Sequence, residues 1–416
     1  MTSERPDDAS PSGVPSVEPL AVRPVPARSA RRDLPLLLAG SAVSTIGASL
    51  SLLAVMIQLR PAGAVWVAAL LAAELVPVVA LAPLAGRLVD RVRNRELIVG
   101  SILVQAVGVL LAAAVGLGEG RAWVIVAGMV LVGVGTAVVN PAVSALLPKV
   151  SGEAGATRAY GWYSAITQAG FLVGFAVAGV LVEATSVRVA LVADGVTYVL
   201  MALAVTAVRA QRVPEPHLSQ GAVWLGFARV RDDRLLLVGV VGLAAAVLAT
   251  VVVNVADVFF VLEDIGAGPA AYGLVTAVWP AAGVAGGWWA GKVVGERRLF
   301  AALAAGAVVM GLALLVAGAA VSLVAVGVGW MLGGAAASVQ RVAITALVRE
   351  RTEDAVRGRV FSAVNAVAQA GNLVGLAAGA VVVGLVGARS SLLLAGVMTV
   401  LAGVVTWLVG RGSLET

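Results

Sequence analysis

Long apolar segments alternate with short polar segments over most of the chain. After a stretch rich in proline, serine and charge at 1–33, apolar runs of about 20 residues or more follow one another along the chain. They fall at 34–59, 64–86, 97–117, 122–147, 159–183, 188–208, 235–261, 270–291, 299–317, 320–348, 360–384 and 390–410. Each run is long enough to cross a hydrocarbon core of about 30 Å as a helix. The pattern therefore predicts twelve membrane-spanning helices.

The polar segments divide the chain into parts. Residues 1–33 predict a disordered cytoplasmic tail, because prolines interrupt any regular element there. Two six-helix bundles are expected at 34–208 and 235–411. The link between them, 209–234, contains an amphipathic stretch that predicts a helix lying on the inner leaflet. A short cytoplasmic tail is expected at 412–416.

The composition indicates an integral membrane protein. Of the 416 residues, 60% are hydrophobic and 12% are charged, which leaves too few polar side chains to cover the surface of a water-soluble globule. Cysteine is absent and His217 is the only histidine, so we expect no disulfide framework, no metal and no cofactor. The formal charge of +6 is spread over the links rather than gathered beside aromatic residues. Nucleic acid is therefore not an expected partner, whereas the lipid bilayer is.

Basic residues mark one side of the predicted spans. With the amino terminus inside, only Arg60, Arg121, Arg188 and Arg389 fall in outside links, and Arg341 lies within a span. The remainder of the 29 lysines and arginines lie inside, as the positive-inside rule requires. The sequence therefore predicts that both termini are cytoplasmic. The composition, rich in alanine and valine, favours a bacterial inner membrane as the location.

The two halves of the chain repeat each other. The sequence Gln-Ala-Gly-Phe-Leu-Val-Gly at 168–174 recurs as Gln-Ala-Gly-Asn-Leu-Val-Gly at 369–375, and Ala-Leu-Leu-Pro at 145–148 corresponds to Ala-Leu-Val-Arg at 346–349 at the same spacing. Parallel repeats related by an axis along the membrane normal are typical of transporters whose substrate site lies between two lobes. We therefore expect an all-α membrane fold with two pseudo-symmetric bundles.

Polar side chains inside the spans are the candidates for binding chemistry. A charge at the bilayer centre costs on the order of 2.5–3.5 kcal/mol, so it needs a partner, a neutral form or a wet cavity. Stripes at i, i+4 and i+7 place several such residues on one helix face, as Thr250, Asn254 and Asp257 are placed. Hydrogen bonding between helices is the alternative for any single amide. The candidates for proton coupling or cavity lining are Glu74, Asp257, Asn254, Gln168, Asn365, Gln369, Asn372, Arg341 and Trp279.

The link at 81–96 has the most specific pattern. An apolar run ends at Gly86, and Asp90, Arg91 and Arg95 follow. We expect a tight hairpin at the membrane surface, in which Gly86 lets two helices approach closely and Asp90 accepts hydrogen bonds from a helix N-terminus or from arginines. This spacing resembles the loop between the second and third helices of the major facilitator superfamily.

The resemblance covers residues from about 34 to 410. Within the superfamily the chain is similar to the branch of macrolide-efflux and enterobactin-exporter-like proteins, through 140–148, 194–198, 221–237 and 357–362. It implies a monomer of the twelve-helix fold that exports small amphipathic compounds, such as drugs or natural products, by proton-driven alternating access. It also implies a cytoplasmic gate in which Asp90 pairs with Arg357 or Arg359. The sixth span, which contains Asp194, is expected at the periphery.

Glycines of the fifth span resemble the motif of the superfamily's antiporters. They are Gly161, Gly170, Gly174 and Gly179, but Phe175 replaces the motif's proline, and Met129 stands where the fourth helix of relatives has arginine. An uptake symporter or an uncoupled facilitator of the same fold is therefore an alternative, and a non-transporting receptor or scaffold is a more distant one. No nucleophile–base pair, metal set or phosphate loop indicates an enzyme.

Overall fold

The computed structural model describes residues 27–115, 121–152, 155–209 and 223–412, which fold almost entirely into helices. The first half contains α1 (Ala27–Leu59), η1 (Arg60–Ala62), α2 (Ala64–Ala80), α3 (Ala82–Arg91), α4 (Asn94–Ala114), α5 (Ala122–Ser151), α6 (Ala156–Ala184) and α7 (Val187–Ala207). The second half contains α8 (Val223–Asp232), α9 (Arg234–Phe259), the π-helical turn η3 (Phe260–Asp264), α10 (Pro269–Ala290), α11 (Glu296–Ala320), α12 (Leu323–Arg351) and α13 (Asp354–Arg411).

The prediction of twelve spans in two bundles is confirmed. Nine helices of the described residues are long and apolar enough to cross a membrane, and the pair α2 and α3, bent by 55°, adds a tenth span. α13 holds two of the predicted spans, since its helix breaks at Gly387, whose φ of 80° favours glycine. α10, with 22 residues, is the remaining span.

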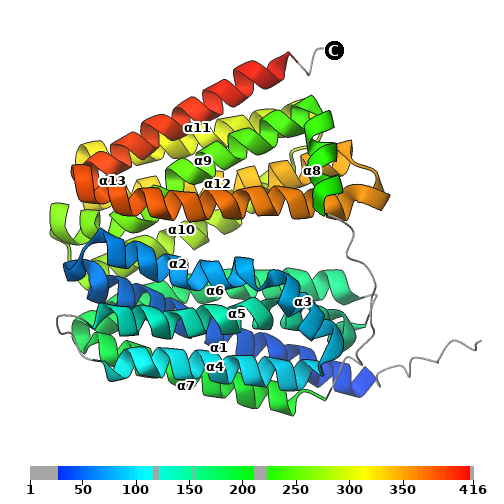
Figure 1. Cartoon of the computed structure of the whole chain (residues 1–416), viewed down its shortest axis with the longest axis vertical. Coiled ribbons are helices and arrows are strands. Elements are labelled where there is room, and N and C mark those ends of the chain that lie inside the picture. The colour runs from blue at the N-terminus through cyan, green and yellow to red at the C-terminus, as the bar shows by residue number, and fades with distance from the viewer. Residues whose placement is uncertain (1–26, 116–120, 153–154, 210–222, 413–416) are drawn as a thin grey trace, which may run out of the picture.

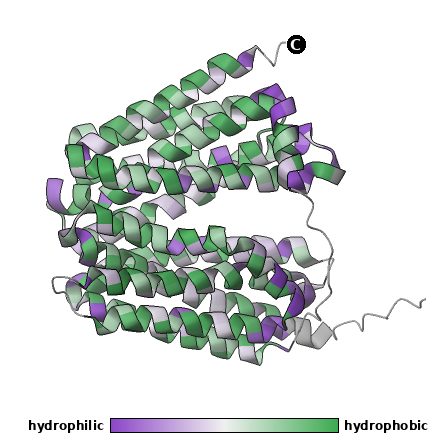
Figure 2. Cartoon of the chain, in the orientation of Figure 1, coloured by the Kyte–Doolittle hydropathy of each residue, from purple (hydrophilic) through white to green (hydrophobic). Residues whose placement is uncertain are grey.

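The two bundles lean against each other at one end only. Their helices converge at the end that carries η1 and η3, here called the closed end, and diverge at the end that carries α3 and α8, here called the linker end (Figure 1). Hydrophilic residues gather mainly at the helix ends, while the helix shafts are largely apolar (Figure 2). This distribution fits a molecule whose middle is surrounded by lipid.

Contacts between α6 and α10 fasten the closed end. A Cβ atom on Gly179 would collide with the carbonyl oxygen of Pro269, and a Cβ on Gly273 would collide with that of Phe175. The Oε2 atom of Glu183 accepts a hydrogen bond of 2.8 Å from the backbone N–H of Ala270. Only glycines allow backbones to come this close, so the halves meet here through their main chains.

An ion pair also crosses the closed end, between η1 and η3. The Nε atom of Arg60 lies 3.4 Å from Oε1 of Glu263. Ion pairs of this exposure contribute little to stability, about 0–1 kcal/mol, so the pair fixes position more than it holds the halves together.

The sequence repeat is matched by equivalent packing in the two halves. A Cβ on Gly174 of α6 would lie 2.5 Å from the side chain of Ser49 in α1, and one on Gly375 of α13 would lie 2.9 Å from Val251 in α9. The repeated glycines thus bring the fifth predicted span against the first in one half, and the eleventh against the seventh in the other. Each pair packs closely within its own bundle.

The chain start differs from the prediction. Residues 1–26 lie outside the described part, but α1 begins at Ala27, inside the tail predicted at 1–33. Asp33 is buried, and its Oδ2 accepts a hydrogen bond from the backbone N–H of Arg209 at 3.1 Å. Because this bond anchors the start of α1 to the end of α7, the helix extends beyond the apolar run.

The predicted hairpin at 81–96 also differs. Residues Ala82–Arg91 form helix α3, which follows α2 after a bend at Leu81, and the turn is confined to the residues before Asn94. Pro83, near the start of α3, lacks the N–H that would continue the helix ladder of α2. The expected close approach at Gly86 is absent in this conformation, since a Cβ there would meet no described atom within 4 Å.

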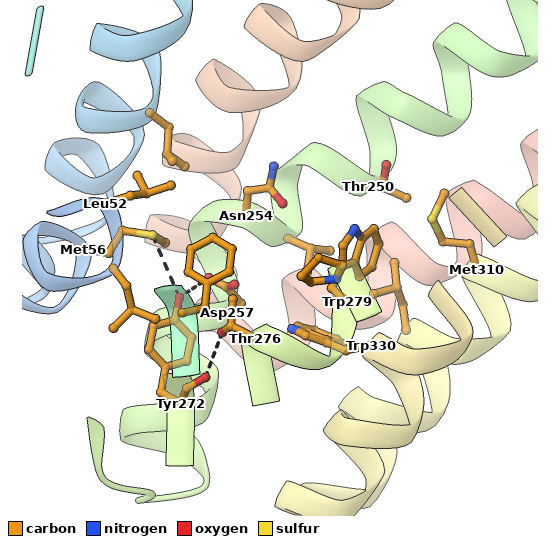
Figure 3. Close-up of a pocket in the computed structure, with 16 residues that line it drawn as sticks. Leu52, Met56, Thr250, Asn254, Asp257, Tyr272, Thr276, Trp279, Met310 and Trp330 are labelled. Carbon is orange, nitrogen blue, oxygen red and sulfur yellow. Dashed lines mark hydrogen bonds between the residues drawn. The ribbon is translucent and has the colours of Figure 1, made fainter. Parts of the chain in front are cut away.

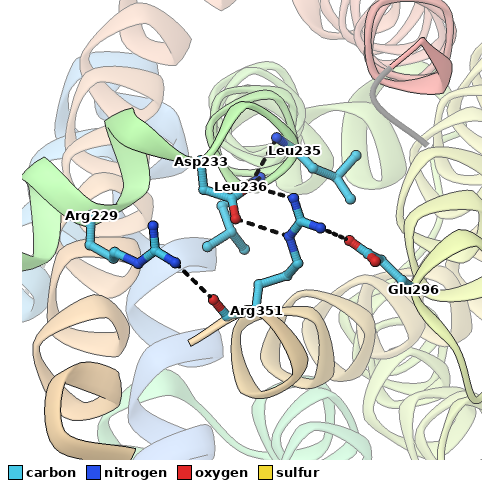
Figure 4. A network of polar contacts seen from close by, with 6 residues as sticks. All are labelled: Arg229, Asp233, Leu235, Leu236, Glu296 and Arg351. Carbon is cyan, nitrogen blue, oxygen red and sulfur yellow. Dashed lines mark hydrogen bonds and ion pairs between the residues drawn. The ribbon is translucent and has the colours of Figure 1, made fainter. Parts of the chain in front are cut away.

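An ionic cluster ties four helices together at the linker end of the second half (Figure 4). Arg351 at the end of α12 binds both carboxylate oxygens of Asp233, at 2.9 and 3.2 Å, and contacts Glu296 of α11 at 2.5 Å. Asp233 also caps α9 by accepting the backbone N–H groups of Leu235 and Leu236. Arg229 of α8 donates to the carbonyl oxygen of Arg351 at 3.4 Å.

The cluster shifts the protonation of Asp233. Partial burial alone would raise the pKa of its carboxyl, but the hydrogen bonds from Arg351 and from the α9 backbone, together with the charge of Arg351, outweigh it and lower the pKa below its ordinary value. Asp233 is therefore ionised at neutral pH.

Candidate functional site

A cavity runs between the helices on the inner side of the second half. It has two adjoining compartments, one of about 250 Å³ near the closed end and one of about 710 Å³ toward the linker end. Their linings share Thr250, Asn254, Trp279 and Met310. Because these four residues belong to both compartments, the space is continuous along α9.

Asp257 and Tyr272 meet at the closed-end compartment (Figure 3). The Tyr272 hydroxyl lies 3.2 Å from Oδ1 of Asp257 and 3.9 Å from the sulfur of Met56, so this contact links α10, α9 and α1. Thr276, one turn along α10, donates to the carbonyl oxygen of Tyr272 at 2.8 Å. Asp257 is 9% exposed and is the only charged residue among those that line this compartment.

The first half contributes only apolar side chains to the closed-end compartment. They are Leu52, Leu53, Met56, Leu71 and Phe175, from α1, α2 and α6. Phe175 stands where the antiporter motif has proline, and its ring stacks on Phe171 with centroids 6.0 Å apart. The wall opposite Asp257 is therefore smooth and apolar, which suits a lipophilic part of a ligand.

The linker-end compartment is polar and is lined by the second half alone. Arg341 of α12 is its only charged lining residue, and the amides of α13 face it. Asn365, Gln369 and Asn372 follow one another at the spacing of a helix face, and Asn372 donates to Gln369 at 2.9 Å. The structure thus brings together the predicted stripes of α9 and α13.

Trp279 lies at the junction of the two compartments and lines both of them. Its ring lies against Gly333, where a Cβ would come within 2.7 Å of Cζ3, and its carbonyl oxygen lies against Gly334, where a Cβ would collide with it. Pro280 follows it inside α10 and removes one backbone donor. Glycines on α12 therefore make the space into which this large side chain fits.

Two predicted lining residues lie elsewhere in this conformation. Glu74 is half-buried within the first half, where its carboxylate interacts electrostatically with that of Asp194, and it lines neither compartment. Gln168 also lines neither compartment, and its side chain points across the interface toward Gly283 of α10. Asp194 is fully buried on the bundle side of α7 and accepts a hydrogen bond from Thr197 at 3.1 Å, whereas Val192 and Val196 on the other side of this helix are exposed.

The arginines of the predicted gate lie at the linker end, and the bonds described for two of them stay within one half. Arg95 donates to the carbonyl oxygen of Thr206 in its own half, and Arg357 pairs with Asp354 one turn before it. Arg359 is half-buried, with its backbone against Gly226 of α8, and Arg91 is exposed at the end of α3.

One of the four fifth-span glycines departs from the expected packing. Gly170, Gly174 and Gly179 each lie against another helix, but a Cβ on Gly161 would meet no described atom within 4 Å. The expected helix contact is therefore absent at Gly161 in this conformation.

Several lining residues were missed by the sequence reasoning. Tyr272 and Thr276 of α10 lie at i and i+4, with the predicted Trp279 at i+7, so the signal that identified the stripe of α9 could have found them. Gln340 precedes Arg341 and lines the same compartment. Trp330 is buried and gave no pattern that distinguishes it from a packing residue.

The sequence matches the Major Facilitator Superfamily over residues 36–330 and 240–414, which together span nearly the whole described chain. The chain belongs to this superfamily. Its members' two-bundle transporter fold accounts for the twelve spans, the internal repeat and the cavity between the halves, and it indicates a transporter rather than an enzyme. No curated protein matches the sequence.

Solved transporters of the superfamily's fold superpose over almost their whole length. The nucleoside transporter NupG has a TM-score of 0.74 at 10% identity, covering 91% of this chain and 98% of that one. The POT family transporter PepTSo has a TM-score of 0.73 at 14% identity, covering 92% and 99%. A bacterial homologue of the iron transporter ferroportin, in an inward-facing state, has 0.71 at 15% identity, covering 91% and 99%. These likenesses establish the fold.

Proposed function

We propose that this chain is a secondary active transporter that exports small amphipathic compounds by alternating access, driven by protons. The observation that supports the proposal most is the cavity between the halves, which has a single carboxylate, Asp257, at its closed-end compartment. An apolar wall faces that carboxylate from the first half. A lipophilic compound and a proton site thus share one space, as coupled transport requires.

The orientation follows from the basic residues. Those of α3, α8 and the ends of α12 and α13 lie at the linker end, so the positive-inside rule assigns that end to the cytoplasm of a bacterial inner membrane. The conformation described is then the one that takes up its substrate from inside. In the opposite conformation Asp90 pairs with Arg357 or Arg359, and Arg357 leaves its present partner Asp354.

Asp257 is the proposed coupling residue. Its carboxylate is nearly buried, is held by Tyr272 and has no cationic partner among the residues that line its compartment. A carboxylate in such a place is stable mainly in its neutral form, so uptake and release of its proton can accompany the change of conformation that moves the substrate.

Proton flux out of acid-loaded proteoliposomes tests the proposal. We expect amphipathic compounds to trigger proton movement in the parent protein, and Asp257→Asn to abolish that movement while binding of the compound persists. Glu350→Gln, which removes an exposed carboxylate at the end of α12, is the matched control and should behave as the parent. Full proton movement in Asp257→Asn would contradict the assigned residue.

Met129 favours the alternative of an uptake symporter or an uncoupled facilitator. Its buried side chain stands where antiporter relatives have an arginine, so this chain lacks a charge that those antiporters have. Compounds that cross the vesicle membrane without proton movement would support the facilitator. Proton movement in the same direction as the compound would support the symporter.

A further inference from the structure

We propose that the linker-end compartment binds the anionic group of the substrate through Arg341, so the transported compounds are amphipathic organic anions. The inference rests on the proposed transport function and names the chemical class that its cavity selects.

Arg341 lies deep in its helix. Ten residues separate it from Arg351 at the end of α12, a distance of about 15 Å along a helix axis. An arginine side chain is much shorter than that, so the guanidinium cannot reach the polar end of α12 by extending along the helix.

The charge of Arg341 is not neutralised within the described residues. Its guanidinium makes no hydrogen bond or ion pair there, although its backbone carbonyl accepts one from Thr345. Every other residue that lines the linker-end compartment is uncharged. Its side chain is exposed to the open compartment, so an anionic ligand there can form charge-assisted hydrogen bonds with it.

The amides of α13 provide further donors. Asn365, Gln369 and Asn372 line the same compartment as Arg341, and Asn372 donates to Gln369 at 2.9 Å. A carboxylate accepts hydrogen bonds from amide groups as well as from a guanidinium. A guanidinium and several amides on one compartment therefore indicate a ligand rich in acceptors, which a carboxylate is.

The remainder of the cavity supplies the apolar part of the site. Trp279 and Met310 line both compartments, and Phe175 and Trp330 line the closed-end compartment beyond them. The linker-end volume of about 710 Å³ lies in the range of sites for drug-sized ligands, and the closed-end compartment adds about 250 Å³. The substrate therefore lies with its anionic group toward the linker end and its apolar body toward Asp257.

Binding of three matched pyrene compounds to the purified full chain tests this inference without requiring transport. The probes are pyrenebutyrate, its methyl ester and pyrenebutylamine, and fluorescence anisotropy measures their affinities. We expect the parent to bind the carboxylate at least tenfold tighter than the ester and the amine. Arg341→Gln should weaken carboxylate binding at least tenfold and leave ester binding unchanged, and Arg341→Lys should retain part of the preference.

Arg349→Gln is the matched control, since this exposed arginine lies on the same helix outside the cavity. It should bind all three probes as the parent does. The inference is overturned if the parent does not bind the carboxylate or does not prefer it, or if Arg341→Gln weakens all three probes equally. Carboxylate binding that depends on Arg341 without flux in vesicles would leave the anion site standing and contradict the transport proposal instead.

Discussion

Two glycines, Gly179 and Gly273, set how closely the halves approach at the closed end. Each lies against main-chain atoms of the other half, so any side chain there must push α6 and α10 apart. We predict that Gly179→Leu destabilises the present conformation by about 1–3 kcal/mol, which shifts the conformational equilibrium at least about fivefold. The linker end should then close more often.

Cysteine chemistry measures this shift, because the chain has no native cysteine and a single substitution gives an unambiguous signal. Labelling of Asn365→Cys in the cavity should slow in Gly179→Leu, and crosslinking of Asp90→Cys with Arg359→Cys should accelerate. Gly161→Leu is the control on the same helix, since a side chain there meets open space. Unchanged labelling would show that the two glycines do not control closure, whereas slower labelling without crosslinking would contradict only the pairing of Asp90 with Arg359.

The cavity residues show how far sequence reasoning reaches at this scale. The stripes of Asn254 with Asp257 and of Asn365 with Gln369 were predicted, because a helix period reveals which residues share a face. The period does not reveal which bundle face that is. For this reason the pattern alone does not distinguish a Glu74 that lines the cavity from one that lies near Asp194 within its own bundle.

Among the helices, the cluster around Asp233 determines how α8, α9, α11 and α12 are joined. We predict that Asp233→Asn lowers the free energy of unfolding at neutral pH by about 2 kcal/mol, the order of a hydrogen bond to a charged group. The lost contacts are the paired bonds from Arg351, while the α9 cap is partly retained by the amide. Thermal unfolding of the purified protein measures the difference.

The pH dependence of this difference follows from the lowered pKa of Asp233. A carboxyl with a lowered pKa stabilises the folded state above its unfolded value of 3.8, and this contribution is lost as the pH falls through the lower folded value. The difference in the free energy of unfolding between the parent and Asp233→Asn should therefore be full at pH 7 and shrink below about pH 3.8. Glu353→Gln, an exposed change near the same end, should show no gap, and a gap that stays constant down to about pH 3 would contradict the assignment.

Helix boundaries were predicted less well than helix existence. Apolar runs mark where lipid requires hydrophobic side chains, but helices continue beyond them wherever backbone partners exist. α1 is extended at its start by the bond between Asp33 and Arg209, and α3 continues α2 around Pro83 as a polar-faced helix. Neither the extension of α1 nor the continuation of α2 into α3 changes the hydrophobic pattern, so the pattern could not reveal them.

For the molecule as a whole, the twelve spans and two bundles follow from the apolar runs, the repeat and the charge distribution. The conformation does not follow from them, because the same repeats serve both states of an alternating transporter. The structure shows it: contacts such as those of Gly179 with Pro269 and Glu183 with Ala270 shut the closed end, and the helices diverge at the linker end (Figure 1).

Sidedness can be measured on intact membranes. We predict that an impermeant maleimide labels Asn365→Cys at least about tenfold faster in inside-out than in right-side-out vesicles, because the cavity opens at the linker end and that end is assigned to the cytoplasm. Arg121→Cys, at the start of α5 on the opposite side, should show the reverse preference. Equal labelling of Asn365→Cys from both sides would contradict the closed end, and a reversed pattern in both variants would invert the topology.

The two halves contribute unequally to the cavity. Its polar groups and its apolar wall lie in different halves, so evolution could change the two independently. Every charged or amide group that lines it belongs to the second half, whereas the first half presents apolar side chains. A chimera that keeps residues 27–209 and takes its carboxy-terminal bundle from a relative should acquire that relative's ligand preference. New specificities could thus arise by exchange of one gene segment, provided that the glycine contact at the seam is kept.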